Sequence, residues 1–356
     1  MPTRRSPRYG GWRTVALTIG ATASLLSAAA CGSTASSRSA APASSSVSVR
    51  TSSATALRLY TYPGNPLFAV AAGLKFNGYG TKAAELKAVA ATPSGIWITG
   101  QPGDIELVRQ VTLAATKAHA IPDIVAYNLP DRDACGKLSA GYSLTAPGYE
   151  AWINQLAAAI GTGDDIVIVE PDGLPDIVEG CLSPAQSAER YQLLRYAMKQ
   201  LGALPHTRVY LDAGNPGMFT DPARMAGPLE AAGIRYGRGF SANVSNFQWT
   251  AAVVTWSQQL ERALGGNVGA VVDTSRNGRG PYSGPDVPQW CKPPGRALGP
   301  TPRFNPGPAG IDAYLWIKDP GASDGSCRGG PPAGQYWPQY AAALAQQTPE
   351  QQSPQS

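Results

Sequence analysis

An acidic residue at the end of a buried strand is the feature of this chain best suited to chemistry. Residues 166–169 read IVIV, and the chain continues as EPDGLP to residue 175. A short, continuous apolar run of this kind predicts a strand buried on both faces. Pro171 cannot donate to a sheet ladder, so it should end the strand and place Asp172 just beyond it. A carboxyl group among apolar walls can have a raised pKa and act as a general acid, which indicates an enzyme.

A second group of charged residues follows the preceding predicted strand. Residues 127–135 read YNLPDRDAC, so the strand ends at Tyr127 and Arg132 stands between two carboxylates. An arginine in such a setting usually forms structural ion pairs. The alternative is that Asp133 lies close to Asp172 and raises its pKa. Neighbouring carboxyl groups with separated pKa values are typical of acid–base catalysis.

The third segment reads WIKDPGASDG over residues 316–325 and again joins a predicted strand to a loop. It contains Asp324 and also Lys318, which either binds a carboxylate or polar ligand or is a surface lysine. Between these segments, residues 273–278 read DTSRNG. Here we expect Asp273 and Arg276 to form a structural ion pair at the rim of the sheet rather than to take part in catalysis.

Predicted strands and helices alternate along the chain and must position these groups. The strands are expected at 95–99, 124–127, 166–169, 209–211, 239–242, 270–272 and 313–317, and amphipathic helices at 105–118, 149–159, 184–201 and 249–264. Such alternation predicts a parallel β/α architecture. The polar residues gather at the carboxyl ends of many strands: Asp133, Asp172, Asp212, Asn243, Asp273 and Asp324. That pattern favours an α/β fold of the TIM-like β/α barrel type over an open doubly wound sheet, which concentrates its site at one switch point.

Tryptophans fall into two classes by position. Trp249 and Trp256 are seven residues apart in a predicted helix, so we expect both to face the core. Trp97 and Trp290 lie on a strand or in a loop and are better candidates for ligand contact, with core packing as the alternative.

The N-terminal segment predicts export. Arginines at positions 4, 5, 8 and 13 precede an apolar stretch at 15–26 and then small residues, so 1–31 is expected to be an export signal. Cys31 follows three alanines and resembles a bacterial lipoprotein box, with plain secretion as the alternative. Residues 32–56 are rich in Ser, Ala and Thr and predict a disordered tether. A single catalytic domain is expected at 57–345, and a disordered tail at 346–356.

Charge and cysteine content agree with an exported protein. The chain has 29 basic and 24 acidic side chains, and without its four leader arginines the net charge falls from +5 to +1. This near neutrality excludes an electrostatic nucleic-acid binder. Apart from Cys31 there are four cysteines, which allow three pairings. We favour Cys135–Cys181 and Cys291–Cys327, each joining one loop region to the next; metal ligation is disfavoured because no CxxC spacing occurs.

Taken in order, the motifs resemble glycoside hydrolase family 6, the secreted β-1,4-glucanases that include cellulases. They are YNLPDRD (127–133), VEPD (169–172), YLDAG (210–214), NVSN (243–246), DTSRNG (273–278), WC (290–291) and WIK…SDG (316–325). The resemblance implies a distorted β/α barrel with seven parallel strands, the same disulfide pairing, inversion at the anomeric carbon and no cofactor. Inversion needs two carboxyl groups roughly 6.5–9.5 Å apart to admit water.

The resemblance also implies a role for each site residue. Asp172 matches the general acid, Asp133 the aspartate that tunes it, and Asp324 the proposed base, which often acts through a water chain. Tyr127 matches the tyrosine below the distorted sugar ring. Substrate-binding positions are expected at Trp97, Arg132, Asp212, Asn215, Asn243, Asn246, Trp290 and Lys318.

Several positions depart from the family pattern. Asn215 and Met218 stand where the family usually has histidine and tryptophan, and Asp319 and Ala322 replace a proline and a glutamate. These departures fall on expected binding positions, so the sequence does not identify which polymer is the natural substrate. Because only two residues separate Asp324 from Cys327, where tunnel-forming exo-acting members carry a long insertion, we expect cleavage within the chain.

The sequence therefore predicts a monomeric, extracytoplasmic endo-β-1,4-glucanase that acts on a β-glucan polysaccharide and meets the membrane only through a lipid anchor at Cys31. Two alternatives remain. One is a cellobiohydrolase, and the other is a tethered glucan-binding protein with weak or no activity on the same fold.

Overall fold

The computed structural model describes residues 57–140, 144–285 and 288–348. The expected export signal at 1–31, the tether at 32–56 and positions 349–356 of the expected tail lie outside these ranges. Helix α9 (Pro338–Gln347) extends two residues into the stretch expected to be a tail. Among the described residues, no helix is long and apolar enough to cross a membrane.

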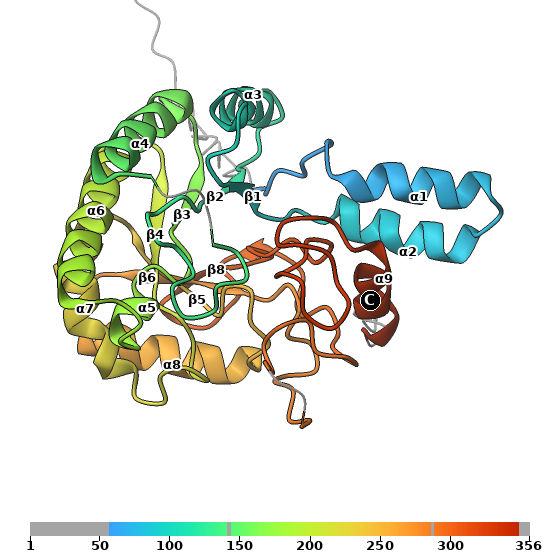
Figure 1. Ribbon diagram of the computed structural model, residues 1–356. Helices are drawn as coiled ribbons and strands as arrows, with labels where there is room; N and C mark the ends of the chain where they lie inside the picture. Colours follow the sequence, from blue (N-terminus) through green and yellow to red (C-terminus); the bar gives the residue numbers. More distant parts are fainter. Residues whose placement is uncertain (1–56, 141–143, 286–287, 349–356) are drawn as a thin grey trace, which may run out of the picture. The chain divides into compact units, whose positions relative to one another are not determined.

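In the described part of the chain, eight strands form one sheet in the order β1-β2-β3-β4-β5-β6-β8-β7 (Figure 1). The strands are β1 Ile96–Ile98, β2 Asp123–Ala126, β3 Ile166–Val169, β4 Arg208–Asp212, β5 Gly239–Ala242, β6 Gly269–Asp273, β7 Arg303–Phe304 and β8 Ile311–Leu315. Strands β1 to β6 and β8 pair in parallel, and β7 pairs antiparallel with β8. The expectation of seven parallel strands is confirmed, whereas the two-residue β7 is too short to give a sequence signal.

The sheet curls until its first strand meets the end of β8, although no ladder joins the two edges. The backbone N–H of Gly95 donates to Trp316 O at 2.8 Å, and Nε1 of Trp97 donates to Ile317 O at 2.9 Å. A Cβ on Gly95 would lie 2.2 Å from Ile317 O, so this close approach requires glycine. The predicted fold, a distorted β/α barrel, is therefore confirmed.

Alternate residues of the strands face two different cores, as their apolar composition predicts. The interior of the curled sheet is filled by Ile121, Val125, Ile166, Ile168, Tyr210, Val271, Ala313, Leu315 and Ile317. The opposite face packs against helices, of which α4, α6, α7 and α8 follow its outer side in Figure 1. The helices before α9 are α1 Pro66–Phe76, α2 Gly80–Ala91, α3 Asp104–Lys117, α4 Ala146–Ile160, α5 Pro175–Val178, α6 Pro184–Gly202, α7 Ala226–Ala231 and α8 Thr250–Ala263.

Side-chain caps set where several helices begin. Ser183 forms a capping box with Gln186 at the start of α6, and Thr145 caps α4. Helix α8 begins at Thr250, which makes Trp249 its N-cap rather than a helical residue. The expected core position of Trp249 is therefore wrong, because helical spacing does not apply to it, and its side chain is exposed. Trp256 is buried as expected, and its Nε1 donates to Phe219 O at 2.6 Å.

One carboxyl group is buried in the barrel interior without a partner. Asp123 is the first residue of β2 and shares the inward face of Val125. No described group donates a hydrogen bond to either of its side-chain oxygens, and it borders a cavity of about 10 Å³ together with Ile121 and Leu315. Burial, and secondarily the charge of Asp273, raise the pKa of Asp123 from 3.8 to about 8.

We expect Asp123→Asn to stabilise the protein, and the gain to grow with pH. Between about pH 4 and the folded-state pKa of about 8, the folded carboxyl holds a proton that the unfolded chain has lost. The free energy of unfolding of the wild type therefore falls as pH rises through this window, whereas the amide has no such dependence. Denaturant unfolding at pH 5 and pH 8 should show the difference widening by on the order of a few kcal/mol. Glu189→Gln, on the exposed surface of α6, is the control, and an equal difference at both pH values would contradict this account.

Candidate active site

Asp172 lies in a strained turn directly after β3. Glu170 and Asp172 have φ angles of 47° and 65°, a left-handed conformation that is uncommon for residues other than glycine. The turn is held by two bonds: Gly173 N donates to Glu170 O at 2.9 Å, and Asp172 N donates to Oδ2 of Asp212 at 3.1 Å. The Asp172 carboxyl, which remains partly exposed, is thereby fixed at the carboxyl edge of the sheet.

The surroundings of Asp172 favour its protonated form. Burial raises its pKa well above the ordinary value, and the nearby carboxylates of Asp212, Asp176 and Asp133 raise it further. Lys318 acts in the opposite direction but does not cancel these effects. Asp212 is itself affected, because burial raises its pKa to about 7. The Asp172 carboxyl therefore keeps its proton to a higher pH than an ordinary aspartate does.

Tyr127 and Asp133 are linked by a serine that the sequence analysis did not identify. The Asp133 Oδ2 atom accepts from the backbone N–H of Ser139 at 2.6 Å and from its hydroxyl at 2.9 Å. The same hydroxyl lies 2.9 Å from the Tyr127 hydroxyl. Arg132 stacks over the Tyr127 ring at 4.7 Å and donates from Nε to Ser139 O at 2.9 Å. The group forms one continuous network. Nη1 of Arg132 also donates to Thr99 O at 3.1 Å, which ties this loop to the end of β1.

Asp324 is held as a carboxylate by two cations. Its Oδ2 accepts from Nη1 of Arg276 at 2.8 Å, and its Oδ1 lies 3.3 Å from Nζ of Lys318. Burial alone would raise the pKa of Asp324, but Arg276 and Lys318 hold it below its usual value. The expected pair of Arg276 with Asp273 is therefore wrong. Asp273 accepts from backbone N–H groups of the rim loops instead, including that of Lys318 at 3.0 Å.

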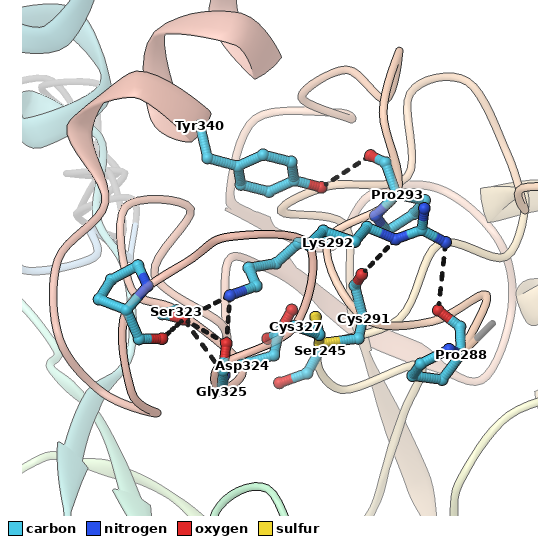
Figure 2. Close-up of a disulfide and its surroundings, with 12 residues drawn as sticks. Ser245, Pro288, Cys291, Lys292, Pro293, Ser323, Asp324, Gly325, Cys327 and Tyr340 are labelled. Carbon is cyan, nitrogen blue, oxygen red and sulfur yellow. Dashed lines mark hydrogen bonds between the residues drawn. A yellow bond between two sulfur atoms is a disulfide. The ribbon is translucent and has the colours of Figure 1, made fainter. Parts of the chain in front are cut away.

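A buried lysine fixes the loop around Asp324 (Figure 2). Nζ of Lys292 donates to the Ser323 hydroxyl at 2.9 Å and to Gly325 O, the residues on either side of Asp324. Lys292 directly follows Cys291, which forms the expected disulfide with Cys327. The Asp324 loop is thus tied to the 291–292 segment by a covalent bond and by an ammonium group. Sequence reasoning missed Lys292 because its partners are more than 30 residues away.

Two buried residues brace the loops that carry Asp133 and Asp172. Glu170 accepts from the backbone N–H groups of Asn128 and Leu129 and from the Tyr149 hydroxyl. Burial raises the pKa of Glu170 to about 7, although these donors oppose the shift. Its position inside the VEPD motif was the available sequence signal.

Arg190 on α6 performs the second bracing role. It donates to Asp131 O at 2.6 Å and Gly173 O at 3.2 Å, and pairs with Asp176 at 3.1 Å. The expected disulfide Cys135–Cys181 joins the same two loop regions. Cys135, Cys181 and Asp176 form the group of possible metal ligands found among the described residues. Their chemistry does not fit an ion, because the sulfurs are bonded to each other and the carboxylate pairs with Arg190.

The expected aromatic contacts lie near these carboxyl groups. Trp97 packs edge-on against Tyr127, with ring centroids 5.2 Å apart, and Nζ of Lys318 lies 5.0 Å from the Trp97 ring. Trp290 is 39% exposed, and a Cβ on Gly136 would lie 3.5 Å from its ring, which places it beside the Asp133 loop.

The expected polar binding residues are engaged with the protein's own groups. Oδ1 of Asn215 accepts from the N–H of Met218 at 3.2 Å, and Oδ1 of Asn243 accepts from Gln248 N at 3.2 Å. Oδ1 of Asn246 accepts from the next backbone N–H at 2.8 Å. Asp212 supports Asp172, as described above. These side chains stabilise the loops through hydrogen bonds, and any contact with a ligand would be made in addition to those bonds.

Comparisons with known proteins agree with this geometry. The model of the family "Glycosyl hydrolases family 6" matches residues 60–348. "Endoglucanase 1" of Streptomyces sp. (strain KSM-9) is 40% identical over 72% of this chain and 70% of its own length. "Endoglucanase 1" of Streptomyces halstedii is also 40% identical, over 74% of this chain and 81% of its own.

A solved structure gives the same result. The endoglucanase Cel6 from Mycobacterium tuberculosis, in complex with a thio-cellobioside, is 39% identical and aligns with a TM-score of 0.75. The alignment covers 82% of this chain and 98% of that one. With the family model matched from the first strand to the last helix and relatives at this level of identity, the chain belongs to glycosyl hydrolase family 6.

Proposed function

We propose that this protein is an inverting endo-β-1,4-glucanase that hydrolyses cellulose or a related β-glucan. The observation that carries the proposal is the opposite shift in the pKa values of two carboxyl groups at the carboxyl edge of the sheet. Burial and neighbouring carboxylates raise the pKa of Asp172, which favours its protonated form, whereas Arg276 and Lys318 lower the pKa of Asp324 and favour its ionised form. An inverting glycoside hydrolase requires one carboxyl group that acts as an acid and another that acts as a base, and opposite pKa shifts provide such a pair.

In the proposed reaction, Asp172 gives its proton to the glycosidic oxygen as the bond from the anomeric carbon to that oxygen breaks. A water molecule attacks the anomeric carbon from the opposite face, so the configuration inverts. The proton released by the water passes towards Asp324, directly or through further water. One C–O bond breaks and one forms, and the next turnover begins when Asp324 has released the proton to solvent and Asp172 has regained one.

The neighbouring residues support these steps. Asp133 raises the pKa of Asp172 by its charge and, through Ser139, is connected to the Tyr127 hydroxyl. We assign Tyr127 to the sugar ring at the cleaved bond, and Asp133 to tuning the acid and orienting the attacking water. The exposed or partly exposed rings of Trp97 and Trp290 suit the apolar faces of sugars, and Lys318 suits their hydroxyl groups.

Cleavage within the polymer is favoured over release from an end. The relatives at 40% identity are named endoglucanases, whereas relatives named cellobiohydrolases are more distant. The segment between Asp324 and Cys327 has only two residues, and Lys292 and the disulfide hold it against the 291–292 segment. Nothing of the length needed to enclose a polymer lies at this position.

Export is proposed from the N-terminal sequence and is supported by the two disulfides, which persist in oxidising compartments. We propose that 1–31 is the signal and that Cys31 carries a lipid, with 32–56 as the tether to a monomeric catalytic domain. The intact mass of the membrane-extracted protein should show a diacylglyceryl addition on Cys31. An unmodified mature mass in the culture medium would contradict the anchor but not the export.

Replacing the acid should abolish hydrolysis. We expect Asp172→Asn to lower kcat on carboxymethyl-cellulose and mixed-linkage β-glucan by about 10²- to 10⁴-fold, because no group then protonates the leaving oxygen. Reducing ends and viscosity are measured together, and an early fall in viscosity with the wild type indicates endo action. Asp131→Asn changes an exposed carboxyl in the same loop as Asp133 and should retain activity. Undiminished turnover by Asp172→Asn would show that the acid is misassigned.

The alkaline limb of the activity profile should respond to Asp212. Because the Asp212 charge raises the pKa of Asp172, Asp212→Asn should lower that pKa. The acid then loses its proton at lower pH, so the alkaline limb of kcat/KM should move towards lower pH. A profile that keeps its alkaline limb while only its height changes would assign Asp212 a purely structural role.

A further inference from the structure

Trp249 is an exposed aromatic residue on the catalytic edge of the barrel. It follows β5 through residues 243–249 and caps the start of α8, so it lies at the carboxyl end of the parallel strands. Asp172 occupies the same edge, just after β3. The Trp249 side chain is 53% exposed, which leaves a large apolar ring in water. This apolar surface is therefore available to a ligand at the edge of the sheet that carries Asp172.

The backbone that carries this ring is held in place from both sides. Nδ2 of the buried Asn277 donates to Gln248 O at 3.0 Å and to the Thr250 hydroxyl at 2.9 Å, the residues before and after Trp249. Gln248 N donates in turn to Oδ1 of Asn243 at 3.2 Å. A side chain on a fixed backbone loses less conformational freedom when it binds a ligand.

The 278–281 backbone supports part of the indole. A Cβ on Gly280 would lie 2.1 Å from Cε2 of Trp249, so the ring rests directly against this glycine. Gly280 also has a φ of 64°, which disfavours any side chain there. The ring is thus packed on backbone over part of its surface and open to solvent over the rest.

The same loop contacts the Asp324 network. Ser245, four residues before Trp249, accepts through its carbonyl from Arg276, and its N–H donates to Oδ2 of Asp273 at 2.9 Å. Arg276 is the residue that pairs with Asp324. A ligand bound on Trp249 would therefore rest on the loop that also supports Arg276.

We propose that Trp249 is a sugar-binding platform that stacks on a pyranose ring of the glucan, away from the cleaved bond. The inference rests on the proposed glucanase function and adds a contact that the carboxyl residues do not make. A flat apolar ring fits the apolar face of a β-linked glucose unit, whose hydroxyl groups lie at its rim. A neutral polymer requires no charge at this position.

The test compares Trp249→Ala and Trp249→Phe with a matched control, Tyr236→Ala. Tyr236 is 41% exposed but precedes β5, so it lies at the opposite edge of the barrel. Affinity electrophoresis in gels with soluble mixed-linkage β-glucan measures binding without turnover, and steady-state kinetics give kcat and KM. We expect Trp249→Ala to weaken binding and raise KM by about threefold to tenfold with kcat on the polymer nearly unchanged. Trp249→Phe should keep most of the affinity, and Tyr236→Ala all of it.

Each outcome separates this inference from the proposed function. Glucan affinity of Trp249→Ala equal to that of the wild type, or a loss that Tyr236→Ala shares at unchanged thermal stability, would overturn the platform. A wild type that binds glucan through Trp249 but hydrolyses none would refute the catalytic proposal and leave the platform intact. Normal hydrolysis and normal glucan binding by Trp249→Ala would overturn the platform and leave the catalytic proposal intact.

Discussion

Much of the active site depends on how the protein distributes charge around buried carboxyl groups. Asp324 contacts two cations, which lower its pKa, whereas Asp172 is surrounded by further carboxyl groups, which raise its pKa. Lys318 contacts Asp324 and lowers the pKa of both groups. Because burial penalises any charge, the two ionisation states follow from which partners are within reach.

Holding carboxyl groups of like charge together requires a rigid frame. Arg190 and the Cys135–Cys181 disulfide connect the two acidic loops, while Glu170 ties the first loop to the end of β3. At the far side of the site, Lys292 and the Cys291–Cys327 disulfide do the same for the Asp324 loop. The scaffold thus opposes the repulsion between these groups and keeps in place the carboxylates that raise the pKa of Asp172.

Aromatic groups lie beside the carboxyl groups of the candidate site. Trp97 is fixed by its bond to Ile317 O, which belongs to the junction where β1 meets the end of β8. The incomplete closure of the sheet therefore also positions a ring beside Tyr127. Trp249 gains its exposure in a different way, because it stands one residue outside the helix that would have buried it.

Local patterns in the sequence indicated the seven parallel strands, the four long helices between them and the loop positions of Asp133, Asp172 and Asp324. Four cysteines left three disulfide pairings open, and the observed pairing was the one favoured by loop order and implied by the family resemblance. Only the tertiary structure decided that Arg276 pairs with Asp324, 48 residues away, rather than with nearby Asp273. It also decided that Lys292 and Arg190 brace the catalytic loops and that Trp249 is exposed. The periodicity that predicts strands and helices is a property of neighbouring residues in the sequence. The charge partners and the burial of a side chain depend instead on segments that meet only in the folded barrel.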